Sequence, residues 1–164
     1  MLISKFRILL AVAVLIAAAT LAGPLQAAGT TVHVSLWDKG ANVEMPTNLG
    51  MNMGGDMSKA TMGIKATPSK VKAGEVTFVV KNISKDTIHE MILARLDDPS
   101  KPEPYLANEN RVDEDRAGDL GEVSELDPGA SGKLTVTLKP GNYLLYCNVP
   151  GHYVAGMWTT FTVQ

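Results

Sequence analysis

The sequence predicts an all-β fold, a Greek-key sandwich or barrel of short strands, on two observations. Apolar and polar residues alternate over short stretches, with the two-residue period of strands that bury one face. Gly and Pro, 15 and 9 of 164 residues, are scattered along the whole length, and no stretch holds a helical apolar period for several turns. With 45% apolar residues and a net charge of −2, the chain can bury a core of single-domain size.

Six to eight strands are expected after residue 30. The pattern is cleanest over 133–139, where Leu134, Val136 and Leu138 alternate with polar residues before the Pro140-Gly141 turn. In the stretch that begins at His89, alternate residues face opposite sides of the strand. The other expected strands cover residues 31–37, 62–66, 76–82, 89–96, 143–147 and 157–163.

One long segment, residues 97–127, interrupts this rhythm as an acidic insertion. It holds 11 of the 17 acidic residues of the chain and only three basic ones. A short helix is expected inside it, at about 110–120. Such a charge run is either a solvated loop or a surface that attracts a basic partner.

Residues 1–28 predict a secretory signal peptide. The cations Lys5 and Arg7 precede an apolar run over 8–22 in which Thr20 is the single polar residue, and the small pair Ala27-Ala28 follows. The alternative is an uncleaved membrane anchor, but the run is shorter than the ~20 residues that a span needs. We therefore expect a single domain over 29–164, exported to the periplasm without stable membrane insertion.

One loop near the C-terminus carries residues that point to a metal. Cys147, His152 and Met157 are spaced C-x4-H-x4-M between two expected strands, and Pro150-Gly151 supplies a sharp turn. Thiolate, imidazole and thioether form a soft ligand set. With a second imidazole they make the trigonal His2Cys site with a weak axial Met that holds blue copper.

The second imidazole must come from another strand, and only His33 and His89 remain. His89 is the better candidate because it shares a strand face with Met91 and Leu93, whereas His33 is expected at the surface. Zinc is disfavoured because Met is a poor zinc ligand. A lone Cys in an oxidising compartment has no internal disulfide partner, so it is buried and inert, paired with another chain, or held by a metal. The spacing with His152 and Met157 favours the metal.

The chain from Met62 to Gln164 resembles the cupredoxins, the plastocyanin/azurin family of type 1 copper proteins. The resemblance rests on the 147–157 loop, on His89, and on the segments 72–78 and 138–143. The loop spacing is similar to that of rusticyanin- and auracyanin-like members, since plastocyanin has a shorter Cys–His gap and azurin a shorter His–Met gap.

The resemblance implies a Greek-key β-sandwich that transfers single electrons between larger redox proteins. It implies one copper ion, cycling between Cu(I) and Cu(II), bound by His89, Cys147 and His152 with Met157 as the axial ligand. The residue after the first His ligand is commonly Asn in the family, whereas this chain has Glu90. An ionised carboxylate there would lower the reduction potential, and a neutral or outward-pointing one would not.

His152 is expected to be the ligand nearest the surface, within a small apolar patch. A cytochrome, an oxidase or a reductase would dock there through a weak, short-lived contact. The residues of the patch are Val149, Pro150, Tyr153, Val154 and Ala155. We expect a monomer.

Other functions are less well supported. Enzymatic activity is not expected, because four protein ligands leave the copper no position for a substrate and no nucleophile–base pair is visible. Binding to nucleic acid is not expected, because no basic stripe is present. A third interpretation is a partner-binding module within a respiratory complex.

A Met-rich segment at 45–62 leaves one alternative function open. Its thioethers either fill irregular gaps in the core or hold a second Cu(I), which would make the protein a copper carrier. The residues concerned are Met45, Met51, Met53, Met57 and Met62.

Overall fold

The computed structural model describes residues 29–164, so the predicted signal peptide at residues 1–28 lies outside the described residues. Strands dominate the described part, and none of its helices is both long and apolar enough to span a membrane. In chain order the elements are β1 (Thr30–Asp38), the 3-10 helix η1 (Met57–Lys59), β2 (Met62–Thr67), β3 (Lys70–Val71), β4 (Gly74–Asn82), β5 (His89–Arg95), β6 (Tyr105–Leu106), β7 (Arg111–Val112), α1 (Glu114–Ala117), β8 (Asp119–Leu126), β9 (Ser131–Leu138), β10 (Gly141–Tyr146) and β11 (Trp158–Val163).

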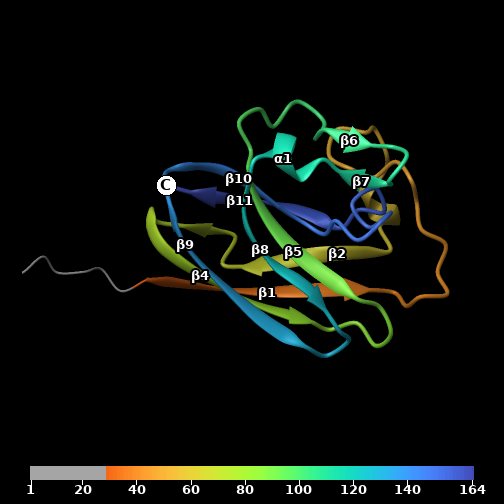
Figure 1. Cartoon of the computed structure of the whole chain (residues 1–164), viewed down its shortest axis with the longest axis horizontal. Helices are drawn as coiled ribbons and strands as arrows, with labels where there is room; N and C mark the ends of the chain where they lie inside the picture. The colour runs from red at the N-terminus through yellow and green to blue at the C-terminus, as the bar shows by residue number, and fades with distance from the viewer. Residues whose placement is uncertain (1–28) are drawn as a thin grey trace, which may run out of the picture.

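Two large sheets face each other and form a sandwich (Figure 1). The first has the strand order β2-β1-β4-β9 and the second the order β3-β11-β10-β5-β8, while β6 and β7 form a separate ribbon. The chain crosses between the sheets from β4 to β5, from β8 to β9 and from β9 to β10, as in Greek-key sandwiches. The predicted all-β sandwich is confirmed.

The first sheet buries one face only. In β1 the inward residues Val32 and Val34 are buried, whereas His33 between them is exposed, as the alternating pattern predicts. Phe78 of β4 packs edge-on against Phe161 of β11, with ring centroids 5.2 Å apart. This contact lies between the sheets and belongs to the main core.

The second sheet is buried on both faces at its central strands, β5 and β10. Every residue of β5 from His89 to Ala94 is buried. Met91 and Leu93 face the main core, whereas Ile92 belongs to a second core on the outer face of the sheet. Two segments outside the sandwich close this outer core, and they contribute Met51, Met53, Tyr105, Val112 and Ala117.

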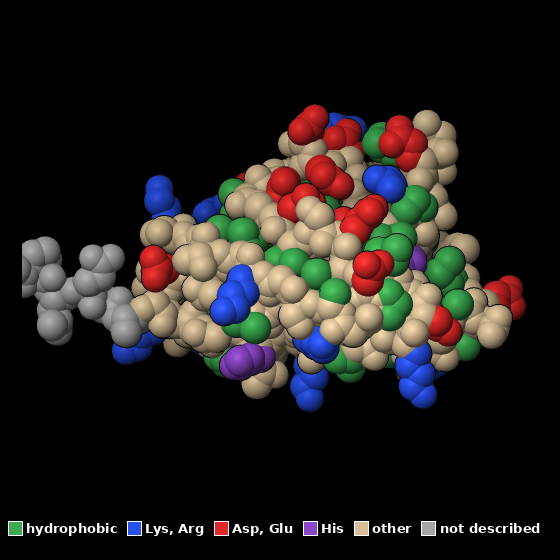
Figure 2. Space-filling view, turned by 60° about the horizontal axis from the view of Figure 1, so that its bottom comes forward, with side chains coloured by type: hydrophobic (Ala, Val, Ile, Leu, Met, Phe, Trp, Pro, Cys, Tyr) green, Lys and Arg blue, Asp and Glu red, His purple; other side chains and the backbone are tan. Residues whose placement is uncertain are grey.

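The acidic segment contains the expected helix. The side chain of Asp113 caps α1 by accepting the N–H of Arg116 over 3.2 Å, and Gly118, in the left-handed conformation at φ 73°, ends it. On the face drawn in Figure 2, acidic side chains gather at the top, the side on which the insertion lies in Figure 1.

The second half of the acidic segment differs from the predicted loop, because residues 119–126 form strand β8. This strand pairs with β5 at the edge of the second sheet. Only Val123 and Leu126 of β8 reach the core, while its acidic residues point outward, so its apolar pattern is too sparse to predict a strand. The insertion proper therefore covers residues 97–118.

Candidate metal centre

The loop between β10 and β11 joins three of the predicted ligands through its backbone. Cys147 directly follows β10, and its N–H donates to the carbonyl of Met157 over 3.1 Å. The N–H of Met157 donates to the carbonyl of His152 over 3.0 Å, and that of His152 to the carbonyl of Val149 over 2.9 Å. The loop thus folds back on itself, and Cys147, His152 and Met157 are all buried.

Two glycines make this loop possible. Gly151 and Gly156 have φ angles of 86° and 101°, in the left-handed region that favours glycine. A Cβ at Gly156 would lie 2.9 Å from the Cβ of Ala60, so the segment before β2 packs directly on the loop. The N–H of Gly151 donates to the carbonyl of Asn110 over 2.8 Å, which ties the insertion to the same loop.

His89, the first residue of β5, supplies the second imidazole. The turn before it depends on Asn82, whose amide donates to the carbonyls of Thr87 and Leu126 over 2.9 and 2.8 Å. Asn82 is fully buried, and these bonds satisfy it. His33, the other candidate, is exposed in the middle of β1 and is not part of the site.

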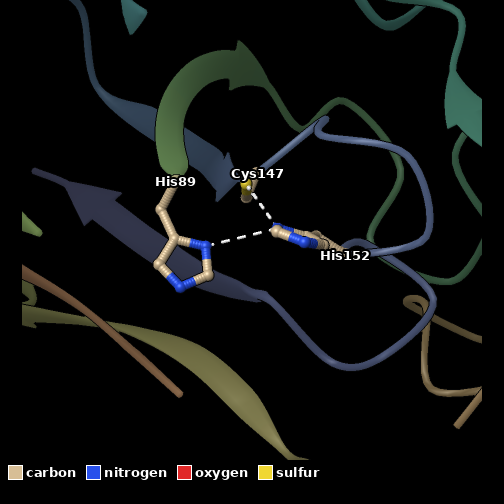
Figure 3. Close-up of side chains that lie close together, drawn as sticks. All are labelled: His89, Cys147 and His152. Carbon is tan, nitrogen blue, oxygen red and sulfur yellow. Dashed lines mark hydrogen bonds between the residues drawn. The ribbon is translucent and has the colours of Figure 1, made fainter. Parts of the chain in front are cut away.

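His89, Cys147 and His152 direct one donor atom each toward a common point (Figure 3). Nδ1 of His152 lies 3.2 Å from Nδ1 of His89 and 3.4 Å from Sγ of Cys147, and all three atoms lie within 4.8 Å of one another. Imidazole and thiolate bind first-row metal ions at about 2.0–2.3 Å, so neighbouring ligands of one ion lie about 3.3–3.7 Å apart. These three side chains therefore fit a single ion, and their chemistry fits blue copper.

Burial favours the neutral form of all three donors. It lowers the pKa of His152 to about 4, with nearby His89 adding to the effect. It also lowers the pKa of His89 against the influence of Asp38, so both imidazoles are neutral at pH 7 and free to bind a metal. Burial raises the pKa of Cys147 to about 12. The thiol therefore needs the positive charge of a metal ion to lose its proton.

Asp38, which the sequence analysis treated only as a strand end, contacts the site from the first sheet. Its Oδ2 lies 2.7 Å from Nε2 of His89, and the two side chains are 4% and 0% exposed. Its Oδ1 accepts the N–H of Gly40 over 2.7 Å. Burial by itself would raise the pKa of Asp38, but hydrogen bonds from Ser84, His89 and Gly40 outweigh burial and lower it. The sequence signal was Asp-x-Gly, which predicts a turn and nothing about a metal site.

Glu90 and Asn148, which follow two of the predicted ligands, are bonded to each other. The N–H of Glu90 donates to Sγ of Cys147 over 3.4 Å, and its Oε1 accepts the N–H of Asn148 over 2.9 Å. Glu90 points into the protein, since it is 8% exposed. Burial raises its pKa to about 7 against the bond from Asn148, and nearby acidic residues add to the rise.

The side chain of Asn148 connects the insertion to the ligand loop. Its Oδ1 accepts the N–H of Val112 over 2.7 Å, and its Nδ2 donates to the carbonyl of Val112 and to Oε1 of Glu114 over 2.9 and 2.7 Å. The residue is 1% exposed, so three protein bonds replace water completely. The sequence showed the acidic segment but not this contact, which spans 34 to 36 positions along the chain.

The predicted docking patch is wrong in three of its five residues. Tyr153, Val154 and Ala155 are buried: segment 49–51 covers Tyr153 and Val154, and Ala155 belongs to the main core. The N–H of Leu49 donates to the carbonyl of Val154 over 2.7 Å, and that of Met51 to the hydroxyl of Tyr153 over 3.0 Å.

His152 itself is 5% exposed and lines a surface cavity of about 220 Å3. The same cavity is lined by the loop after β1 and the start of β2, through Gly40, Ala41, Val43, Met45, Thr61 and Met62, and by Thr87. The site therefore opens to the surface in this hollow and not on the predicted apolar patch.

A β-sandwich that buries two imidazoles and a thiol around one point has the fold and the donor set of a blue copper protein, a cupredoxin. The family model described as copper binding proteins of the plastocyanin/azurin family matches residues 49–164. The chain belongs to this family. The resemblance drawn from the sequence and its copper cofactor are confirmed.

The relatives agree with this assignment. Auracyanin-B of Chloroflexus aurantiacus is 49% identical over 45 residues, which span 27% of this chain and only 19% of that protein. The solved structure of auracyanin A from Chloroflexus aurantiacus, a "blue" copper protein, aligns with a TM-score of 0.54 at 23% identity over 83% of this chain and 99% of its own. Reduced rusticyanin aligns with a TM-score of 0.51 at 20% identity over 84% and 82%. At these identities the solved structures support the fold alone.

Proposed function

We propose that this protein carries single electrons between redox proteins of the periplasm through one type 1 copper ion. His89, Cys147 and His152 would hold the ion, with Met157 as a fourth, weak ligand. The observation that carries the proposal is the convergence of three buried donor atoms within 4.8 Å. Bound copper supplies the one-electron change between Cu(I) and Cu(II). Export is inferred from the leader-like residues 1–28.

The surroundings of the donors suit electron transfer better than catalysis. His89 is held by a strand, while Cys147 and His152 are held by a loop whose backbone bonds also include Met157. A site fixed in this way changes little between two oxidation states. With four protein ligands it offers no position to a substrate, so we expect no enzymatic activity.

The edge of His152 is the expected exit for electrons, because it lines the surface cavity. Val43 and Met45 at the rim are 38% and 41% exposed and offer apolar contact to a partner. A cytochrome, an oxidase or a reductase would therefore dock over this hollow, in place of the small apolar patch expected from the sequence. Val43→Asp should slow electron exchange with such a partner at unchanged reduction potential.

The decisive experiment is the visible spectrum of the purified protein after addition of one equivalent of Cu(II). We expect an intense thiolate-to-copper band that disappears in Cys147→Ser and persists in the control His33→Gln. Met157→Leu should keep the band and change the reduction potential, because a weak fourth ligand would tune the potential of the site. A colourless wild-type protein would refute the proposal, and an unchanged potential in Met157→Leu would remove Met157 from the ligand set.

Copper handling is a second candidate function, favoured by one observation. Met45 and Met62 line the same cavity as His152, so two thioethers lie beside the site. Met51 and Met53 instead pack into the outer core, and Met57 does not line the cavity. Binding of two or more Cu(I) per chain, reduced to one in Met45→Leu, would favour this function, whereas one copper per chain favours the electron carrier.

A further inference from the structure

A buried carboxylate joins the two sheets beside the metal centre. Asp38 is the last residue of β1 in the first sheet, and His89 is the first residue of β5 in the second. Oδ2 of Asp38 lies 2.7 Å from Nε2 of His89, the ring nitrogen that points away from Cys147 and His152. The two side chains are 4% and 0% exposed, so water does not compete for this bond.

We propose that Asp38 is a positioning residue for the copper site: it holds the proton of His89 on Nε2 and favours Cu(II) over Cu(I) through its negative charge. This inference rests on the proposed role of His89 as a ligand. It gives Asp38, which lies outside the ligand set, control over both the orientation of a ligand and the reduction potential.

The hydrogen bonds determine which nitrogen of His89 carries the proton. A neutral imidazole has one N–H, which can donate either to Asp38 over 2.7 Å or to Nδ1 of His152 over 3.2 Å. The bond to the carboxylate is shorter and charge-assisted, so it is the stronger of the two. The proton therefore resides on Nε2, and the lone pair of Nδ1 is directed at the point that Cys147 and His152 also face.

The carboxylate is itself held in place. The N–H of Gly40 donates to Oδ1 over 2.7 Å, and His89 occupies Oδ2, so each oxygen of Asp38 has a donor. The side chain thus has little freedom to turn away from His89. A fixed anion makes the imidazole a more basic ligand for the metal. It also lies in a poorly solvated region, where its charge interacts more strongly with the charge of the metal than it would in water. It stabilises the more positive oxidation state of the metal and so lowers the reduction potential.

Asp38→Asn separates charge from shape, because Asn keeps the size and one acceptor oxygen. We expect the blue band to remain and the affinity for Cu(II) relative to Cu(I) to fall about tenfold, the lower end for loss of a residue behind a metal ligand. A tenfold change in this ratio raises the potential of a one-electron couple by about 59 mV. The control is Asp86→Asn, an exposed carboxylate that accepts the N–H of Ala41 over 3.3 Å, and its potential should equal that of the wild type.

A second measurement needs no copper and therefore tests the positioning separately. Two-bond 1H–15N correlations of the histidine rings in the copper-free protein should show His89 protonated on Nε2. In Asp38→Ala, which removes the acceptor, the population protonated on Nδ1 should rise, and affinity for Cu(II) should fall by about 10- to 100-fold.

The outcomes are distinct. A wild-type His89 protonated on Nδ1, or an Asp38→Asn potential equal to that of the wild type, would overturn the inference. Absence of a blue band in the wild type would instead refute the proposed function. The position of the proton on His89 could still be measured by NMR of the copper-free protein. A merely structural Asp38 would lower the stability of Asp38→Asn without moving its potential.

Discussion

The two sheets of the sandwich differ in what covers their outer faces. In the first sheet, strands such as β9 alternate between inward and exposed residues, and the outer face meets solvent. In the second sheet, both faces of β5 and β10 are buried, because segment 49–53 and the insertion close over the outer face. A third layer thus lies on one side of the sandwich only.

This difference decides which residues can act on the metal centre. From the first sheet an inward residue at a strand end, Asp38, is bonded to His89. In the second sheet, the two sides of β5 both contribute: His89 from the interior and Glu90 from the covered side. The outer layer therefore does more than bury apolar surface, since through Asn148 it touches the loop that carries Cys147.

The largest expected effect is on the outer core itself. Ile92→Ala should lower the free energy of unfolding by about 2–5 kcal/mol, because Ile92 is 0% exposed and the cavity would have no solvent access. Val136→Ala, at a half-buried position of the first sheet, should lower the free energy of unfolding by clearly less. Urea unfolding of the copper-free variants measures both. Equal costs would mean that the outer layer packs only loosely on the second sheet.

Asn148→Ala should have the next largest effect, a loss of about 1–3 kcal/mol, because it leaves the buried N–H and carbonyl of Val112 and a half-buried oxygen of Glu114 without this partner. The thiolate-to-copper band should also shift, since Asn148 follows Cys147. Asn142→Ala, at an exposed position of β10, is the matched control and should change neither quantity. A destabilised variant with an unaltered spectrum would show that the insertion supports the fold but not the site.

Glu90→Gln tests the charge on the covered side of β5. Burial raises the pKa of Glu90 from 4.5 to about 7, so the unfolded chain loses this proton at lower pH than the folded protein does. The contribution of Glu90 to stability is therefore full below pH 4.5 and is lost as the pH rises toward 7. In urea unfolding, the copper-free Glu90→Gln variant should have the same free energy of unfolding as the wild type at pH 4 and a higher one at pH 8.

The control for this substitution is Glu109→Gln, an exposed residue of the insertion, whose free energy of unfolding at pH 8 should equal that of the wild type. Equal stabilities of Glu90→Gln and the wild type at pH 8 would contradict the raised pKa of Glu90.

The smallest effect is expected on the solvent face of the first sheet. His33→Gln should change the free energy of unfolding by no more than about 0.5 kcal/mol, since the side chain is exposed, and should leave copper binding intact. A copper titration, monitored through the visible band, measures copper binding by this variant. A weakened band would mean that the first sheet contributes to the site beyond Asp38.

The sequence by itself determined the sandwich, the copper chemistry and most of the strands. Alternation over 133–139 and the C-x4-H-x4-M loop are local patterns, and their physical meaning depends on spacing alone. His89 could be preferred over His33 because it shares a strand face with Met91 and Leu93. The structure confirms that His89, and not His33, lies with Cys147 and His152.

Only the tertiary structure decided what surrounds that loop. Asp38 lies 51 positions from His89 in the sequence, and Asn148 lies 34 positions from Glu114, so no local pattern predicts either contact. Strand β8 and the burial of Tyr153 depend in the same way on which segment happens to cover which face. Ligand spacing is set by the geometry of one turn, whereas the orientation of the ligands and their electrostatic environment are set by packing between distant segments.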